Sequence, residues 1–176
     1  MVTITISGAP GTGTTTVSQL LHKKLGISYV YAGELFREEA KRHGMSLEEF
    51  GRYCEQHPEV DRRLDEYQRD LLKKGNIILE GRMSGWIAYL NNIPALKVLL
   101  TADRNTRAER IVKREGSTIA EKLREMEKRE MSEAKRYKNY YNVDINDTSI
   151  YDIVIDTVDK TPDEIVSMIV EHVGEG

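Results

Sequence analysis

The sequence predicts an α/β fold in which a five-stranded parallel sheet carries helices on both faces. Short apolar segments rich in Val and Ile alternate with longer segments of helical periodicity, which is typical of strands buried on both sides of a parallel sheet. The strands are expected at Val2–Ser7, Ser28–Tyr31, Ile77–Glu80, Ala95–Thr101 and Ile153–Asp156. With 176 residues the chain is too short for two ordinary domains, so we expect a single domain over residues 1–176.

The expected helices are delimited by residues that favour helix ends. Glycines stop three of them, a proline stands at one first helical position, and two begin with a Ser/Thr-x-x-Glu capping box. We expect helices from Gly13 or Thr14 to Leu25, Ser46 to Tyr53, Pro58 to Lys74, Arg104 to Glu115, Thr118 to about Tyr140, and from Thr161 onward. In the third of these, the residues that recur on one face are Val60, Leu64, Tyr67 and Leu71.

The segment Gly33–Lys74 interrupts the alternation of strands and helices. It places two or three helices between the second and third strands, and it is too short for a separate domain. We therefore expect a helical flap that closes over a ligand site at the edge of the sheet.

Composition and charge exclude several classes of protein. Lys and Arg number 26 against 29 Asp and Glu, for a net charge of -3, so no positive field suggests a nucleic-acid partner. The alternating run Val2–Ile6 follows Met1 directly, so we expect no signal peptide, and no apolar run is long enough to suggest a membrane partner. The single cysteine, Cys54, suits a reducing compartment. We expect a cytoplasmic monomer.

A phosphate-binding loop follows the first strand and opens the first helix. The segment Gly8–Thr15, GAPGTGTT, matches the pattern G-x-x-x-x-G-K-[ST] at every position but one. Its glycines let the backbone point N–H groups at anionic oxygens, and the helix N-terminus adds positive potential. The strand–loop–helix context predicts a P-loop NTP-hydrolase fold. The residues expected to bind ATP are Ser7, Gly8, Ala9, Pro10, Gly11, Thr12, Gly13, Thr14 and Thr15.

The exception in this loop is Thr14, which occupies the lysine position. Threonine donates a hydrogen bond but brings no charge, so Mg²⁺ and arginines elsewhere must offset more of the phosphate charge. Thr15 stands where a Mg²⁺-ligating hydroxyl is expected. A dinucleotide site is not indicated, because the order of the glycines differs from G-x-G-x-x-G and no acid ends the second strand.

Two further segments end strands next to this loop. Ala32–Arg37, AGELFR, follows the second strand, and Glu80–Arg82, EGR, ends the third. Because the carboxyl ends of parallel strands meet at one edge of the sheet, we expect Arg37 and Arg82 to hold a second phosphate. Glu80 is expected to accept a hydrogen bond from a Mg²⁺-bound water. On a later helix, Arg129, Glu133 and Arg136 stand at i, i+4 and i+7 and so share one face, which is either a site or a solvated surface.

Together these segments resemble the cytidylate kinases, in particular their short archaeal-type branch, over nearly the whole chain. The residues that carry the resemblance are GAPGTGTTT at Gly8–Thr16, AGELFR at Ala32–Arg37, EGR at Glu80–Arg82 and RxxxExxR at Arg129–Arg136. The resemblance implies a nucleoside-monophosphate kinase that transfers the γ-phosphoryl group of ATP, with Mg²⁺, to CMP and dCMP. It implies no further partners beyond these nucleotides.

The resemblance also implies roles for individual residues. The acceptor nucleotide is expected at Gly33, Arg37 and Arg82, with Glu133 near its sugar. Arg129 and Arg136 are expected to be catalytic, closing on the reacting phosphates. Arg107, Arg110 and Arg114 flank a turn at Gly116 and form a short lid over about residues 107–118, in which Arg110 is the expected catalytic residue. The loop Thr157–Lys160 is expected to pack against the adenine of ATP.

The chain departs from longer bacterial cytidylate kinases after the third strand. They read G-R-D-x-G-T where this chain has Gly81–Trp86, GRMSGW, so the acid expected to contact the base is missing. The alternatives therefore include another nucleoside-monophosphate kinase, with UMP or AMP as acceptor. A non-catalytic P-loop nucleotide-binding regulator is a further alternative, since the loop lysine is absent. A P-loop GTPase is not indicated, because neither N-K-x-D nor a D-x-x-G switch is found.

Overall fold

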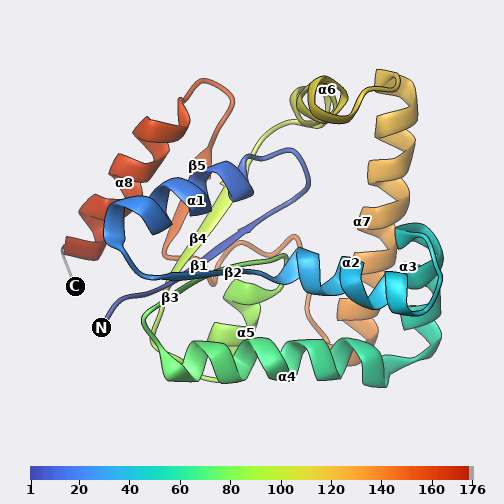
Figure 1. The fold of residues 1–176 in the computed structure, drawn as a ribbon, viewed down its shortest axis with the longest axis horizontal. Coiled ribbons are helices and arrows are strands. Elements are labelled where there is room, and N and C mark those ends of the chain that lie inside the picture. The colour runs from blue at the N-terminus through green and yellow to red at the C-terminus, as the bar shows by residue number, and fades with distance from the viewer. Residues whose placement is uncertain (175–176) are drawn as a thin grey trace.

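The computed structural model describes residues 1–174, so the last two residues of the expected 1–176 domain lie outside the described range. Figure 1 shows the arrangement of the elements. The strands are β1 (Thr3–Gly8), β2 (Ser28–Tyr31), β3 (Ile77–Glu80), β4 (Leu96–Thr101) and β5 (Ile153–Asp156). The helices are α1 (Thr14–Leu25), α2 (Ala32–Arg42), α3 (Leu47–Gln56), α4 (Pro58–Lys74), α5 (Ser84–Leu90), α6 (Arg104–Glu115), α7 (Ile119–Tyr141) and α8 (Pro162–Gly174).

The five strands form one parallel sheet in the order β2-β3-β1-β4-β5, which confirms the predicted fold class. Strand β1 is central: Ile6 pairs with Glu80 of β3 on one side and with Val98 of β4 on the other. The chain leaves β1 for α1 at the point where the order of the strands reverses. In open α/β sheets ligands bind at this edge, beyond the carboxyl ends of the strands.

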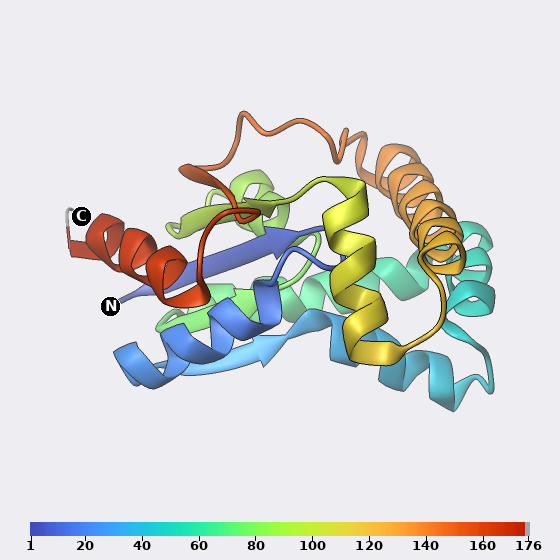
Figure 2. The same cartoon turned by 90° about the horizontal axis from the view of Figure 1, so that it is seen from above.

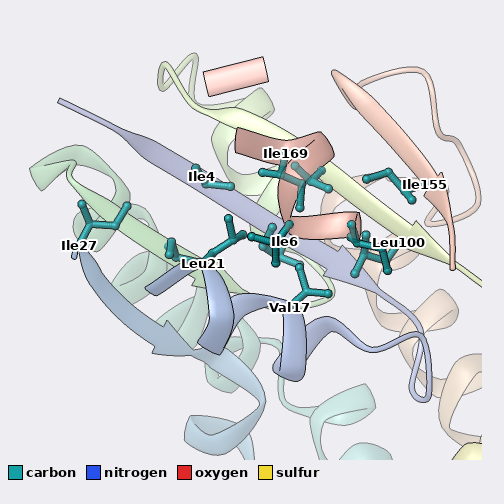
Figure 3. Packing of buried hydrophobic residues seen from close by; sticks show 12 residues of the cluster. Ile4, Ile6, Val17, Leu21, Ile27, Leu100, Ile155 and Ile169 are labelled. Atoms are coloured by element: carbon teal, nitrogen blue, oxygen red, sulfur yellow. The ribbon is translucent and has the colours of Figure 1, made fainter. Parts of the chain in front are cut away.

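The hydrophobic core lies on both faces of the sheet. Helices α1 and α8 cover one face, and α4 and α5 lie toward the other (Figure 1). Figure 3 shows how side chains of α1 and α8 meet those of the strands on the first face: Ile4, Ile6, Val17, Leu21, Leu100, Ile155 and Ile169. Side chains buried on both faces account for the near-continuous apolar strand sequences.

Helix α5 is absent from the sequence prediction. Its residues, SGWIAYL, lack a polar face, and Ser84 to Ala88 are all buried between the sheet and α4. A short helix that is apolar on every side has no amphipathic period from which it can be predicted, even though its last residues, Tyr89 and Leu90, are exposed.

The predicted apolar face of α4 is wrong at one position. Tyr67 is 50% exposed, while the neighbouring Gln68 is buried. The residues that α4 buries are Val60, Asp61, Gln68 and Leu72. This helix therefore turns two polar side chains, Asp61 and Gln68, toward the interior of the protein.

Helices α2, α3 and α4 form the insertion between β2 and β3, and we call these three helices the flap. The flap has a small apolar cluster of its own around Phe50, Cys54 and Val60. Its middle helix, α3, runs beside α7 (Figures 1 and 2). Two ion pairs link these helices, Lys128 to Glu48 at 3.4 Å and Lys135 to Glu55 at 3.2 Å.

No helix within residues 1–174 has the length and the apolar character that crossing a bilayer requires.

The two faces of strand β5 provide a test of the core. Ile155 is 1% exposed, whereas the adjacent Val154 is 48% exposed. We expect Ile155→Ala to lower the free energy of unfolding by about 2–5 kcal/mol, because it removes buried methyl groups and leaves a cavity. Val154→Ala is the control and should cost less than about 1 kcal/mol. Urea denaturation of both variants measures the difference, and equal costs would contradict this account of the sheet.

Candidate active site

The phosphate loop joins the central strand to the first helix. Gly11 has φ 85° and Gly13 has φ 91°, in the left-handed region that only glycine adopts without strain. At Gly11 a Cβ would also lie 2.7 Å from the backbone oxygen of Arg107, so α6 packs directly against the loop (Figure 2). The predicted loop geometry therefore depends on its glycines, and at Gly11 on the neighbouring helix as well.

The N-terminus of α1 is open to an anion. Its N-cap is Gly13, which provides no side-chain cap, and the first turn of the helix contains no acidic residue. The free N–H groups of a first turn and the positive end of the helix dipole favour phosphate. Ser7, in contrast, points its hydroxyl at α5, where it accepts a hydrogen bond from Gly85 N and lies 3.1 Å from Ser84 Oγ.

Glu80 joins the phosphate loop to the neighbouring strand. Thr14 Oγ1 and Thr15 Oγ1 both donate to Glu80 Oε2, at 2.8 and 2.7 Å. The other oxygen, Oε1, accepts a hydrogen bond from the hydroxyl of Tyr29 on β2. Burial and the hydrogen bond to Glu80 raise the pKa of Tyr29 well above its usual value. The threonine at the lysine position is therefore a hydrogen-bond donor to a buried carboxylate.

The same residues fit a magnesium ion. Mg²⁺ prefers oxygen ligands and is usually held by one or two side chains together with phosphate oxygens and water. The Thr15 hydroxyl and the Glu80 carboxylate are such ligands and lie side by side at the open end of α1. Tyr29 has no corresponding signal in the sequence, because a tyrosine within a strand is ordinarily a packing residue.

A second charged group lies beyond β3. Arg82 Nε donates to Glu133 Oε2 at 2.8 Å, and Arg129 Nε donates to Glu133 Oε1 at 3.0 Å. Burial alone would raise the pKa of Glu133, but the charges of Arg82 and Arg129 outweigh it, so the pKa lies below its usual value. The structure thus brings together three of the predicted site residues, one from the turn after β3 and two from α7. Two guanidinium groups around one carboxylate leave a net positive charge, which suits an anionic ligand.

The segment after β2 forms the first turns of α2. Gly33 packs closely, because a Cβ there would lie 2.5 Å from the ring of Tyr31. Arg37 is exposed, and its guanidinium carbon lies 5.7 Å from the centre of the same ring. Arg37 is therefore placed on α2 as predicted, with its charge in solvent and a stacking partner beneath it.

The three arginines of the predicted lid have different partners in the structure and do not form one group. Arg110 donates to the carbonyl oxygens of Gly11 and Thr157 and to the hydroxyl of Thr157. Arg107 is buried and donates to Glu130 of α7 at 2.6 Å. Arg114 is exposed and pairs with its neighbour Glu115. Arg110 thus links the phosphate loop at Gly11 to the start of the loop Thr157–Lys160.

Arg136 lies apart from Arg129, although both are on α7. Its guanidinium is buried, and Nε lies 3.3 Å from Asp61 Oδ2 of α4. Seven residues of helix separate the two arginines by about 10 Å along the axis. Arg129 precedes Glu130, which pairs with Arg107 beside the phosphate loop. Arg136, in contrast, contacts the flap. Asp61 is not among the predicted site residues, although an acid beside Val60 and Leu64 in the apolar stripe of α4 is a usable signal.

A half-buried acid of α4, Asp65, predicts a dependence of stability on pH. Burial raises the pKa of Asp65 from 3.8 to about 7, and its contact with Tyr141 offsets this only in part. The folded state then holds a proton that the unfolded state loses above pH 3.8, so the free energy of unfolding falls as pH rises toward 7. We expect Asp65→Asn to remove this loss, so its stability relative to wild type is greater at pH 8 than at pH 5. Urea denaturation at both pH values measures this, and a difference that does not change with pH would contradict it.

The sequence matches that of known proteins over most of its length. The model of the Cytidylate kinase-like family matches residues 3–159. A cytidylate kinase of Pyrococcus horikoshii is 45% identical over 166 residues, which cover 94% of this chain and 85% of that protein. One from Methanocaldococcus jannaschii is 49% identical over 155 residues, covering 88% of this chain and 87% of that protein.

Solved structures share the fold at lower identity. The shikimate kinase of Aquifex aeolicus superposes with a TM-score of 0.55 at 20% identity, over 99% of this chain and 97% of that one. At this identity the likeness concerns the fold alone. The family match and the two archaeal relatives, together with the phosphate loop at the centre of the sheet, show that this chain belongs to the cytidylate kinase-like family.

Proposed function

We propose that this protein is a cytidylate kinase, which transfers the γ-phosphoryl group of ATP to CMP, and to dCMP, giving ADP and CDP or dCDP. The observation that carries the proposal is the placing of two anion sites at one edge of the sheet. The phosphate loop lies after β1 and the Arg82–Glu133–Arg129 group after β3, and these two strands are neighbours. Membership of the family supports both the reaction and the acceptor.

The donor phosphates fit the phosphate loop. The N–H groups of Gly8–Thr15 and the N-terminus of α1 hold the β- and γ-phosphates. Thr15 would ligate Mg²⁺ and Glu80 would hold it through a water, and the ion would neutralise charge on the phosphate oxygens. Arg110 positions the loop through Gly11 and ties it to the Thr157 segment, where the adenine packs.

The acceptor fits between the flap and the group beyond β3. Arg37 and Arg82 bind its phosphate, Gly33 lets α2 approach Tyr31 closely, and Glu133 accepts hydrogen bonds from the sugar hydroxyls. Arg129, half-exposed beside Glu133, stabilises the charge that spreads over the transferred phosphoryl group. Arg136 is a second arginine of the acceptor site. No covalent intermediate with the protein is needed, because positioning and electrostatics supply the rate.

The flap and the lid exclude water during transfer. If water reached the γ-phosphate, ATP would be hydrolysed and the acceptor would not be phosphorylated. The flap of residues 33–74 and the short lid near residues 107–118 close over the two nucleotides, in a single domain.

The acceptor is tested by measuring ADP formation from ATP and Mg²⁺ with CMP, dCMP, UMP, AMP, GMP and dTMP offered separately. We expect the highest kcat/KM with CMP, and ADP formation without acceptor slower by at least about 100-fold, because an open site does not assemble the phosphate-binding arginines. A preference for UMP or AMP would move the protein to another nucleoside-monophosphate kinase activity. Binding of ATP without transfer to any acceptor would instead indicate the non-catalytic regulator.

The role of Arg129 is tested by substitution. We expect Arg129→Ala to lower kcat with CMP by about 100- to 1000-fold, because one preorganised positive group is lost from the transition state. Arg124→Ala is the matched control, since Arg124 is an exposed arginine on the same helix and should leave kcat within about twofold. Steady-state kinetics measure kcat of the two variants. An equal loss in both would contradict a catalytic role for Arg129.

A further inference from the structure

Tyr29 completes a set of three hydroxyl groups around the carboxylate of Glu80. Thr14 and Thr15 donate to Oε2 at 2.8 and 2.7 Å, and the Tyr29 hydroxyl donates to Oε1 at 2.5 Å. Glu80 is only 2% exposed, and its side-chain partners within residues 1–174 are these three neutral groups. Neutral donors stabilise a buried negative charge without neutralising it, so a cation beside Glu80 is favoured.

The sheet places Tyr29 where its hydroxyl reaches Glu80. In the register of β2 and β3, Tyr29 pairs with Ile78, and Tyr31 pairs with Glu80. Residues two positions apart on a strand share a face, so Tyr29, Ile78 and Glu80 lie on one face of the sheet. The ring of Tyr29 packs against the core cluster that contains Ile78. A phenylalanine at this position would keep the packing of the ring and lose only the hydrogen bond.

The three hydrogen bonds leave an acceptor position on one particular oxygen of Glu80. An ionised carboxylate offers about four acceptor positions, two on each oxygen. Thr14 and Thr15 fill both positions on Oε2, whereas Tyr29 fills one on Oε1. Among the described residues the remaining position is therefore on Oε1, the oxygen that Tyr29 holds. A metal-bound water would donate its hydrogen bond there.

The missing loop lysine makes the orientation of this carboxylate more important. A lysine at position 14 would bring an ammonium group to the phosphates. Thr14 directs its hydroxyl to Glu80 instead and adds no positive charge. Beside Glu80 the positive charge is therefore left to Mg²⁺.

We propose that Tyr29 is a positioning residue of the magnesium site, whose hydroxyl holds Oε1 of Glu80 toward the metal-bound water while Thr14 and Thr15 hold Oε2. This role rests on the proposed function, in which Mg²⁺ binds with ATP beside Thr15 and Glu80, and it deepens that function. The hydroxyl of Tyr29 acts through Glu80 and contacts neither the metal nor the nucleotides. Removing a hydrogen bond of this kind from a metal-holding side chain typically lowers metal affinity by about 10- to 100-fold.

Titration calorimetry tests this role through ATP binding, measured once with Mg²⁺ and once with EDTA in its place. We expect Tyr29→Phe to raise the Kd for ATP by about tenfold with Mg²⁺ and by less than about twofold with EDTA. Tyr89→Phe is the matched control, because it removes a hydroxyl from a tyrosine of α5 that is 52% exposed. Both of its Kd values should stay within about twofold of wild type.

Steady-state kinetics provide a second measurement that a purely structural role would not change. For Tyr29→Phe the Mg²⁺ concentration that gives half-maximal rate should rise about tenfold, while KM for CMP stays within about twofold. A hydroxyl that only supports the fold would lower the free energy of unfolding in urea and leave this dependence on Mg²⁺ as it is in wild type.

A double-mutant cycle with Glu80→Gln tests whether Tyr29 acts through the carboxylate. The quantity compared is the ratio of the Kd for ATP with EDTA to the Kd with Mg²⁺. Adding Tyr29→Phe to Glu80→Gln should change this ratio by less than about twofold, because the carboxylate that Tyr29 positions is already lost.

Three results would overturn the role of Tyr29 and leave the kinase in place. They are unchanged Kd values in Tyr29→Phe, an equal loss of ATP affinity with Mg²⁺ and with EDTA, and a full effect of Tyr29→Phe in the Glu80→Gln protein. If wild-type protein bound ATP equally with Mg²⁺ and with EDTA, the magnesium site would fail and this role with it. If wild-type protein transferred no phosphate to CMP, the proposed function would fail whatever the result for Tyr29→Phe.

Discussion

The buried carboxylate of Glu80 is the interaction on which the site depends. Glu80 ends β3, and its two oxygens hold Thr14 and Thr15 of the phosphate loop and Tyr29 of β2. Because β3 lies between β1 and β2, this side chain connects three elements at the carboxyl edge of the sheet. The next two residues, Gly81 and Arg82, lead to the Arg82–Glu133–Arg129 group, so Glu80 also fixes where this group begins relative to the phosphate loop.

Helix α7 carries charged residues inward at helical spacing. Glu133 is held between Arg82 and Arg129, and Arg136 is held against Asp61. Taking such charges out of water costs several kcal/mol for each ion unless other groups or a ligand compensate. Two buried charge clusters on one helix are therefore poor devices for stability alone. They are better suited to the charged acceptor that we propose.

The contacts between the flap and α7 are of two kinds, which differ in how much they contribute to stability. The Lys128–Glu48 and Lys135–Glu55 pairs lie at the surface, where such pairs contribute little. Tyr140, whose hydroxyl donates to the backbone at Cys54 and Glu55, and the buried Asp61–Arg136 pair lie deeper. The flap is thus attached to α7 mainly at Arg136 and Tyr140, toward the C-terminal end of the helix that also carries Arg129 and Glu133.

The sequence by itself determined the five strands, the phosphate loop and most of the helices, because apolar periodicity, glycines and capping residues are local signals. The i, i+4 spacing also placed Arg129 and Glu133 on one face of a helix, whereas only the resemblance to the cytidylate kinases grouped Arg82 with them. Tertiary structure decided the rest. Helix α5 and the inward turn of Gln68 in place of Tyr67 depend on packing that no local period encodes. Thr14 and Glu80 are 66 positions apart, and Asp61 and Arg136 are 75 apart, so their pairing exists only once the sheet and the flap have folded together.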